Sequence, residues 1–260
     1  MDQPVVLHER RGAVHWITIN RAQRRNALNL EVVEAIAGGV DAAQRDPECR
    51  AIVLTGAGDA AFCAGADLKT DEGGAFQVDY AHPQHYVIDL FKRMEACTLP
   101  IVARVNGHVM AGGIGLLCAC DMAVAVDDAR FGTPETGVGV FPMMILTYML
   151  RIVPRRKLFE MCITAQPLDA REALEAGLVN HVVPRAGLDA RLDALLACTT
   201  DKSPTAIRLG KQAFRAMQDM SLPQAFEYAQ LMVPVMASTD DAREGMRAFR
   251  ERRPPVWTGR

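Results

Sequence analysis

Short apolar runs alternate with longer amphipathic stretches over the first half of the chain. Four runs have the patterns of strands, and they cover residues 13–20, 51–56, 101–107 and 122–126. Between them, LEVVEAIAGGVDAAQRD (30–46) and HYVIDLFKRMEAC (85–97) have helical spacing. Strands that alternate with helices predict an α/β fold with largely parallel pairing.

The second half of the chain has helical patterns. Asp169 and Glu172 have the spacing of a capping box, and Ser203 followed by proline is typical of a helix start. We expect a core of residues 1–195 and a C-terminal helical region of residues 196–260. Such a helical region would pack on the core or on another subunit.

Composition and charge exclude some functions. The chain has 260 residues, 50% hydrophobic and 23% charged, which is ordinary usage for a soluble globular protein. Its formal net charge of -2 creates no global field that would attract nucleic acid or an anionic membrane. An anionic ligand must therefore meet a local basic patch.

The sequence also predicts a cytoplasmic location without a membrane partner. The N-terminus has no apolar signal region, and the longest uncharged apolar run, Val109 to Cys120, is far shorter than the roughly 20 residues of a spanning helix. The seven cysteines have no zinc-binding spacing and suggest no disulfide framework. We therefore expect reduced packing cysteines and no metal site.

Three glycines interrupt the apolar run GHVMAGGIGLLCACD (107–121). Gly112, Gly113 and Gly115 each cost roughly 1 kcal/mol against alanine inside a helix. One interpretation is tight packing of the helix under a sheet. The other is a helix start where the backbone approaches a ligand closely and amide N–H groups stabilise negative charge.

A second glycine loop favours the ligand interpretation. LTGAGDAAFCAGADLK (54–69) also leaves a predicted strand through glycines, and Gly65–Ala66 offers another accessible backbone. Two converging amides would form an oxyanion hole, in which one donor is worth on the order of 3 kcal/mol in the transition state. A dinucleotide-binding loop fits less well, because the third glycine of G-x-G-x-x-G is missing.

The motifs FCAGADLK, VNGHVMAGG and FGTPETGVG, in this order, resemble the crotonase, or enoyl-CoA hydratase/isomerase, superfamily. NRAQRRNAL near the start and EGMRAFRERR near the end extend the resemblance over most of the chain. It implies a spiral of ββα units, a C-terminal helical region that builds a trimer or a dimer of trimers, and an acyl-CoA substrate. The amides of Ala66 and Gly112 would bind the thioester oxygen and stabilise an enolate. No separate cofactor is implied, because coenzyme A is part of the substrate.

The resemblance also implies contacts to coenzyme A, whose phosphates need basic side chains. The matching positions are Arg24 or Arg25, Lys69, and Phe249 with Arg252. The last two residues could reach a ligand of a neighbouring subunit. The alternative for each cation is an ordinary solvated surface charge.

The acid/base residues depart from the hydratase pattern. Hydratases of the family usually carry two glutamates, and the first of these positions is Gly115 here. Glu135 remains at the second, although Thr133, Pro134 and Glu135 also fit a plain helix start. A single base suits isomerisation of an enoyl-CoA double bond. One-glutamate hydration, retro-aldol cleavage and a non-catalytic CoA-binding scaffold remain alternatives.

Two further features bear on the acyl group. Gly115 could open room beside it, and residues 70–91 could form a lid. Polar side chains of that segment could replace the missing glutamate, and the candidates are Tyr80, His82, His85 and Tyr86.

Overall fold

Two sheets form the core of the computed structural model, which describes residues 3–68, 80–81 and 84–260. The larger sheet has the order β1-β2-β3-β5-β7-β10, and the smaller has the order β4-β6-β8-β9. The strands of the larger sheet are β1 (Val6–Arg11), β2 (Val14–Ile19), β3 (Ala51–Gly56), β5 (Ile101–Val105), β7 (Met122–Val126) and β10 (His181–Val183). Those of the smaller are β4 (Ala61–Cys63), β6 (His108–Met110), β8 (Arg130–Gly132) and β9 (Leu168–Asp169).

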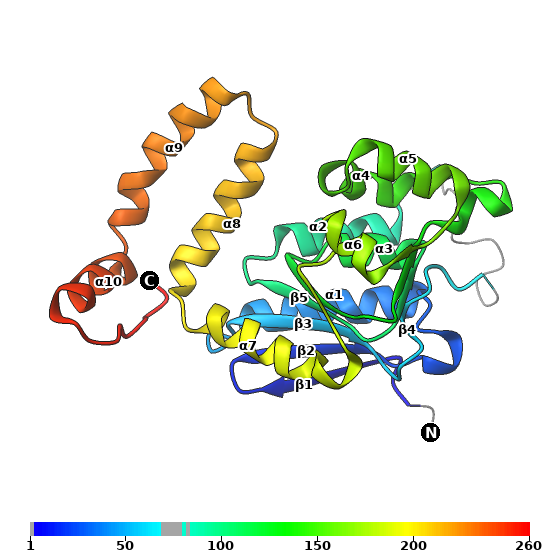
Figure 1. Ribbon diagram of the computed structural model, residues 1–260. Coiled ribbons are helices and arrows are strands. Elements are labelled where there is room, and N and C mark those ends of the chain that lie inside the picture. Colours follow the sequence, from blue (N-terminus) through cyan, green and yellow to red (C-terminus); the bar gives the residue numbers. More distant parts are fainter. Residues whose placement is uncertain (1–2, 69–79, 82–83) are drawn as a thin grey trace.

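The larger sheet is parallel from β2 to β10, and β1 is antiparallel to β2. Every residue of β3 is buried, as expected for a central parallel strand with both faces covered. The helices α1 (Leu30–Arg45) and α7 (Leu188–Thr200) pack on this sheet, and α2 (Tyr86–Ala96) packs on α1 (Figure 1). The predicted α/β class with parallel pairing is confirmed.

The chain contributes strands to the two sheets in turn. β3 of the larger sheet is followed by β4 of the smaller, β5 by β6, and β7 by β8. Helices α2, α3 (Gly112–Cys118) and α4 (Met143–Ile152) follow these strand pairs. The predicted spiral of ββα units is confirmed. Within the smaller sheet β4, β6 and β8 are parallel, so their carboxyl ends meet at one edge.

Local sequence signals account for several helix starts. The Asn29 side chain accepts a hydrogen bond from Val32 N at the start of α1. Asp169 and Glu172 form the predicted capping box of α6 (Ala170–Glu175). Ser203 caps α8 as predicted. The other helices of the described chain are α5 (Arg155–Thr164), α8 (Pro204–Gln218), α9 (Leu222–Ala237) and α10 (Asp240–Glu251).

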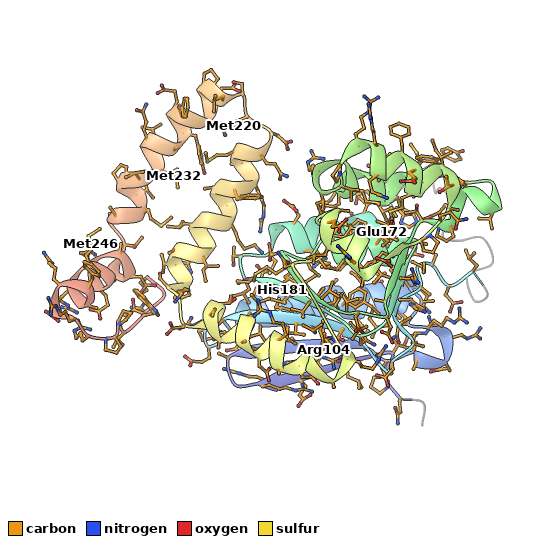
Figure 2. The ribbon with its side chains drawn as sticks, viewed as in Figure 1. Arg104, Glu172, His181, Met220, Met232 and Met246 are labelled. Atoms are coloured by element: carbon orange, nitrogen blue, oxygen red, sulfur yellow. The ribbon has the colours of Figure 1, made fainter. Side chains whose placement is uncertain are left out.

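Helices α8 to α10 form a C-terminal arm that projects from the core (Figure 1). Two side chains of α8 attach the arm to the segment before β5. Lys211 Nζ lies 2.5 Å from Asp121 Oδ2 and donates to Leu99 O, and Arg215 donates to Cys97 O. No residue of α9 is buried. Figure 2 shows Met220, Met232 and Met246 along the arm. In the described ranges, none of the helices combines the length and apolarity needed to cross a membrane.

Candidate active site

Three segments meet where the parallel strands of the smaller sheet end. Residues 64–66 follow β4, residues 111–112 follow β6, and residues 133–135 follow β8. Met110 pairs with Gly132, and Ala111 N donates to Gly132 O over 2.8 Å. The carboxyl ends of parallel strands are where α/β proteins place ligands. This edge therefore collects both glycine loops and the segment that carries Glu135.

The first loop presents the N–H of Ala66. Gly65 has φ +87°, a conformation that favours glycine, and its carbonyl accepts from Leu28 N over 2.7 Å. Because a planar trans peptide directs its N–H and C=O in opposite directions, the Ala66 N–H points away from Leu28. A bond of 2.8 Å from Asp67 N to Leu28 O fixes the next peptide group as well.

The second loop presents the N–H of Gly112. Ala111 has φ 50° and ψ −126°, a strained conformation for a residue with a side chain. Its carbonyl accepts from Ile114 N over 2.9 Å, so the N–H of the same peptide group points out of the start of α3. Gly113 allows close packing at this point, because an added Cβ would lie 2.3 Å from Cys63 O.

The two loops touch. A Cβ added to Gly112 would lie 3.9 Å from Ala66 N, and one added to Gly65 would lie 3.0 Å from Gly112 N. In the part of the chain that the structure describes, neither the Ala66 N–H nor the Gly112 N–H has a hydrogen-bond acceptor. Two unsatisfied donors of adjacent loops can therefore bind one negatively charged oxygen.

Glu135 lies in a 3-10 helix (Pro134–Val138) directly after β8. Its Oε2 is buried and has no hydrogen-bond partner among the described residues. Burial raises the pKa of this carboxyl above its ordinary value, and a hydrogen bond from its own backbone amide offsets part of the rise. Thr133 occupies the N-cap position and Glu135 lies in the first turn, as a helix start predicts, but the Thr133 hydroxyl donates to Met161 O and makes no capping hydrogen bond. A carboxyl with one unpartnered oxygen and a raised pKa, on the same sheet edge as two free amides, suits proton transfer.

Gly115 does not open room for an acyl group, contrary to our expectation. An added Cβ would lie 2.4 Å from Ile145 Cγ2 and 2.6 Å from Phe91 Cζ. Side chains of α2 and α4 therefore fill the place of a second carboxylate. The pattern around Gly115 could not show this, because both neighbours are distant in the sequence.

The predicted coenzyme A contacts fall into two groups. Arg24 and Arg25 are exposed, and Arg25 O accepts from Ala64 N over 3.0 Å, which places this pair beside the first loop. Phe249, 85% exposed, and Arg252 lie at the end of α10, far from that loop in the same chain (Figure 1). Lys69 lies outside the described residues.

The segment expected to form a lid is described only in part. His82 lies outside the described residues, and Tyr80 is 92% exposed. The His85 side chain accepts a hydrogen bond from Val87 N at the start of α2. Tyr86 packs against the hydrophobic core. These contacts give His85 and Tyr86 structural roles at the start of α2, and a role of either side chain in place of the missing glutamate stays a prediction.

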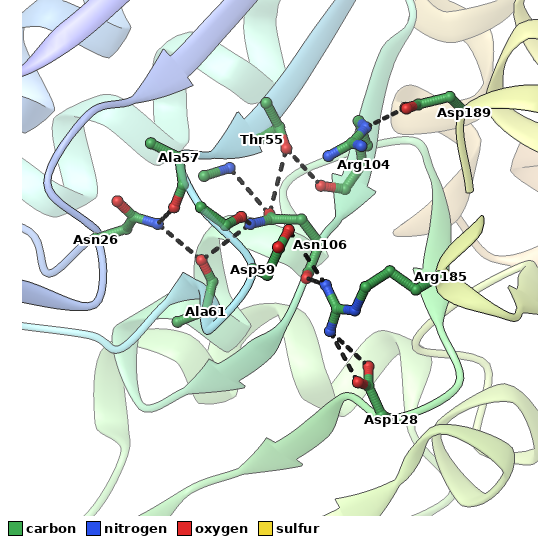
Figure 3. A network of polar contacts seen from close by, with 12 residues as sticks. Asn26, Thr55, Ala57, Asp59, Ala61, Arg104, Asn106, Asp128, Arg185 and Asp189 are labelled. Atoms are coloured by element: carbon green, nitrogen blue, oxygen red, sulfur yellow. Dashed lines mark hydrogen bonds and ion pairs between the residues drawn. The ribbon is translucent and has the colours of Figure 1, made fainter. Parts of the chain in front are cut away.

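Buried asparagines hold the loop that leads into β4, and sequence reasoning did not identify them. Asn106 Nδ2 donates to Gly58 O over 2.6 Å, and its Oδ1 accepts from Gly56 N over 3.1 Å (Figure 3). Asn26 Nδ2 donates to Ala61 O over 2.7 Å. The available signal was the residue type, because asparagine side chains often hydrogen-bond to the backbone of nearby turns.

Comparison with known proteins identifies relatives over nearly the whole chain. The family model described as enoyl-CoA hydratase/isomerase matches residues 9–260. A putative enoyl-CoA hydratase of Thermus thermophilus is 36% identical over 249 residues, which are 94% of this chain and 97% of the relative. A short-chain-enoyl-CoA hydratase of Clostridium acetobutylicum is 33% identical over 260 residues, 97% of each chain. The crystal structure of an enoyl-CoA hydratase of Mycobacterium smegmatis has a TM-score of 0.89 at 31% identity and covers 98% of this chain and 99% of its own.

Proposed function

Because the chain belongs to the enoyl-CoA hydratase/isomerase family, we propose that it shifts the double bond of an enoyl-CoA by moving one proton through Glu135. The observation that carries this proposal is the meeting of three segments at one sheet edge, which bring two free amides and a carboxyl whose Oε2 is buried and unpartnered. No cofactor takes part, since coenzyme A is carried by the substrate.

The reaction requires two proton transfers. The Glu135 carboxylate removes a proton from C2 of a 3-enoyl-CoA, and the electrons of the C–H bond move into an enolate whose oxygen is bound by the amides of Ala66 and Gly112. The protonated Glu135 then delivers the proton to C4. The double bond moves from C3–C4 to C2–C3, without oxidation or addition of water.

The packing around Gly115 supports isomerisation over hydration. Addition of water needs a group that orients the nucleophile as well as one that transfers the α-proton. Phe91 and Ile145 occupy the space of the first hydratase glutamate with apolar atoms. Within the described residues, Glu135 is thus the carboxyl at this edge that fits a proton-transfer role.

Hydration by Glu135 alone is the second candidate function. The observation that favours it is that the Clostridium acetobutylicum and Mycobacterium smegmatis relatives are called enoyl-CoA hydratases.

The two candidates are distinguished by supplying 2-enoyl-CoA and 3-enoyl-CoA separately and resolving the products by mass and chromatography. Double-bond migration with little hydration supports the isomerase; rapid formation of a 3-hydroxyacyl-CoA from 2-enoyl-CoA would replace it with a hydratase. If neither substrate turned over, a 3-hydroxyacyl-CoA lyase assay and a binding assay would be next.

Restoring a glutamate at residue 115 is not expected to create a hydratase. In Gly115→Glu the new side chain would overlap Ile145 and Phe91, and we expect overpacking to cost about 3 kcal/mol of stability. Thermal unfolding and hydratase assays would measure both effects. Gly38→Ala is a suitable control, because an added Cβ there meets no atom within 4 Å. A stable Gly115→Glu protein with raised hydratase activity would show that the packing is not as described.

The rate should fall at acidic pH because Glu135 must be ionised to accept the proton. Burial raises its pKa above the ordinary 4.5, so the acidic limb of the kcat profile should lie above pH 4.5. A profile from about pH 4 to 8, with stability checked at each pH, would locate this limb. A flat profile in a folded protein would contradict ionisation of Glu135 as the limiting event.

The exposed apolar arm supports a homotrimer or a dimer of trimers. Several large hydrophobic side chains on α8 to α10 are more than half exposed, among them Phe214, Phe226, Leu231 and Phe249. Surfaces of this kind mark association sites. Assembly would also explain how Phe249 and Arg252 reach a coenzyme A bound to a neighbouring chain. Light scattering should show a multiple of three of the 28.4 kDa chain, and a monomer would contradict the assembly.

A cytoplasmic location is part of the same proposal. All seven cysteines are free, and five of them are buried. Unpaired thiols are typical of a reducing compartment.

A further inference from the structure

A buried ion pair lies directly beside the first oxyanion donor. Arg21 Nη2 lies 2.5 Å from Asp67 Oδ2, and the two side chains are 10% and 4% exposed. Asp67 is the residue after Ala66, whose N–H is a proposed oxyanion donor. We propose that Arg21 and Asp67 are positioning residues that hold the Ala66 amide in its catalytic orientation. This inference rests on the proposed function.

Arg21 connects both segments that fix the Ala66 amide. Its Nη1 donates to Ala27 O over 2.6 Å while its Nη2 binds Asp67. Leu28, the next residue after Ala27, donates to Gly65 O and accepts from Asp67 N. The guanidinium therefore closes a ring of contacts around the peptide group that carries the Ala66 N–H.

The position of Arg21 is itself fixed. Its backbone N donates to Asn26 Oδ1 over 3.1 Å, and its carbonyl accepts from Asn26 N over 2.9 Å. Asn26 in turn donates to Ala61 O at the start of β4. The two ends of the ion pair thus attach to the end of β2 and to the loop after β4. An oxyanion donor acts only when it is held rigidly before charge develops, and these contacts supply that rigidity.

A buried ion pair is by itself weak evidence of a contribution to stability. A buried pair can be replaced by apolar residues of similar volume without loss of stability, whereas removal of one partner leaves an unpaired charge. The pair also has no net charge, so Asp67 does not repel an enolate formed at the neighbouring amide. A positioning role and an electrostatic role therefore predict opposite effects of Asp67→Asn, whereas Arg21→Met slows the reaction under both.

The test compares Asp67→Asn with Arg21→Met. If the pair acted only through charge, Asp67→Asn would leave an uncompensated guanidinium and speed enolate formation, while Arg21→Met would slow it. If the pair positions the amide, both variants slow the reaction. We expect both to lower kcat by about 100-fold with little change in KM, since a misplaced group of this kind costs about that factor.

Two more variants separate positioning from folding. Arg21→Lys keeps the charge but cannot hold Ala27 O and Asp67 together as the guanidinium does, so its kcat should be intermediate. Arg21→Met/Asp67→Leu leaves no buried charge; it should fold and yet remain slow. The control is Asp189→Asn, which removes a carboxylate that accepts from Arg104 Nε over 2.6 Å on α7, away from this loop. Its kcat should match the wild type.

The readout is the rate at which 3-enoyl-CoA is converted to 2-enoyl-CoA, together with exchange of its C2 protons with deuterium from solvent, KM and thermal unfolding. Conversion by the wild type that is lost in Glu135→Gln establishes the proposed function independently of the ion pair. With that established, opposite effects of Asp67→Asn and Arg21→Met, or wild-type exchange in the double variant, would overturn the positioning role. Equal slowing of Asp189→Asn would also overturn it.

Discussion

Glu135→Gln should lower the rate of double-bond migration by about 10³-fold or more. General acid–base catalysis contributes roughly 10²- to 10⁴-fold, and in the proposed reaction one carboxyl performs both proton transfers. The amide of glutamine has nearly the same shape and cannot accept the C2 proton at neutral pH. Steady-state kinetics with 3-enoyl-CoA would measure the loss, which should appear in kcat with little change in KM.

Loss of stability cannot account for that effect. The pKa of Glu135 is raised in the folded protein, so its contribution to stability is fully present below the unfolded pKa and is lost as pH rises through the folded pKa. The Gln variant carries no such charge and should be at least as stable as the wild type at neutral pH. Thermal unfolding checks this. Wild-type kcat in a folded Glu135→Gln protein would remove Glu135 from the mechanism.

Gly65→Ala should separate the two glycine loops. The new Cβ would lie 2.6 Å from Ala111 Cβ, and the backbone there has φ +87°. Strain and overlap together should cost about 3 kcal/mol of stability. Displacement of the amides of Ala66 and Gly112 should lower kcat by about 100-fold. Thermal unfolding and initial rates at a temperature where the variant is folded would measure both.

Gly58→Ala is the matched control for that change. Gly58 also has a positive φ of +72°, but an added Cβ meets only Ala22 Cβ at 3.3 Å within 4 Å. Gly58→Ala should lower the free energy of unfolding by about 1 kcal/mol, because alanine disfavours this backbone conformation, and it should have little effect on kcat. Equal losses of stability and activity in the two variants would contradict the prediction. The effect of Gly65→Ala would then not come from overlap with Ala111 in the second glycine loop.

Local patterns predicted much of the fold. The strand at residues 51–56, the capping box of Asp169 and Glu172, and the start of α8 at Ser203 depend on neighbouring residues, and all are confirmed. The glycine loops could likewise be recognised from their own spacing. Their roles, and that of Glu135, remain proposals that the geometry supports.

Contacts between distant segments could not be predicted in the same way. The side chains that fill the space beside Gly115 come from α2 and α4, and a single glycine is compatible with either a cavity or close packing. The pair of Arg21 and Asp67 joins residues 46 apart in sequence. The available signal for Asp67 was its charge, because its neighbours in the loop are small and apolar. The sequence does not show that its partner is Arg21, and only the fold brings the two together.

The most direct measurement is the fate of 3-enoyl-CoA with wild-type protein in deuterium oxide, followed by mass spectrometry and NMR. Transfer of one proton by one carboxyl should give 2-enoyl-CoA as the first product, with part of the hydrogen removed from C2 retained at C4 and no added water. Formation of 3-hydroxyacyl-CoA without accumulation of 2-enoyl-CoA would contradict a Glu135-dependent isomerase.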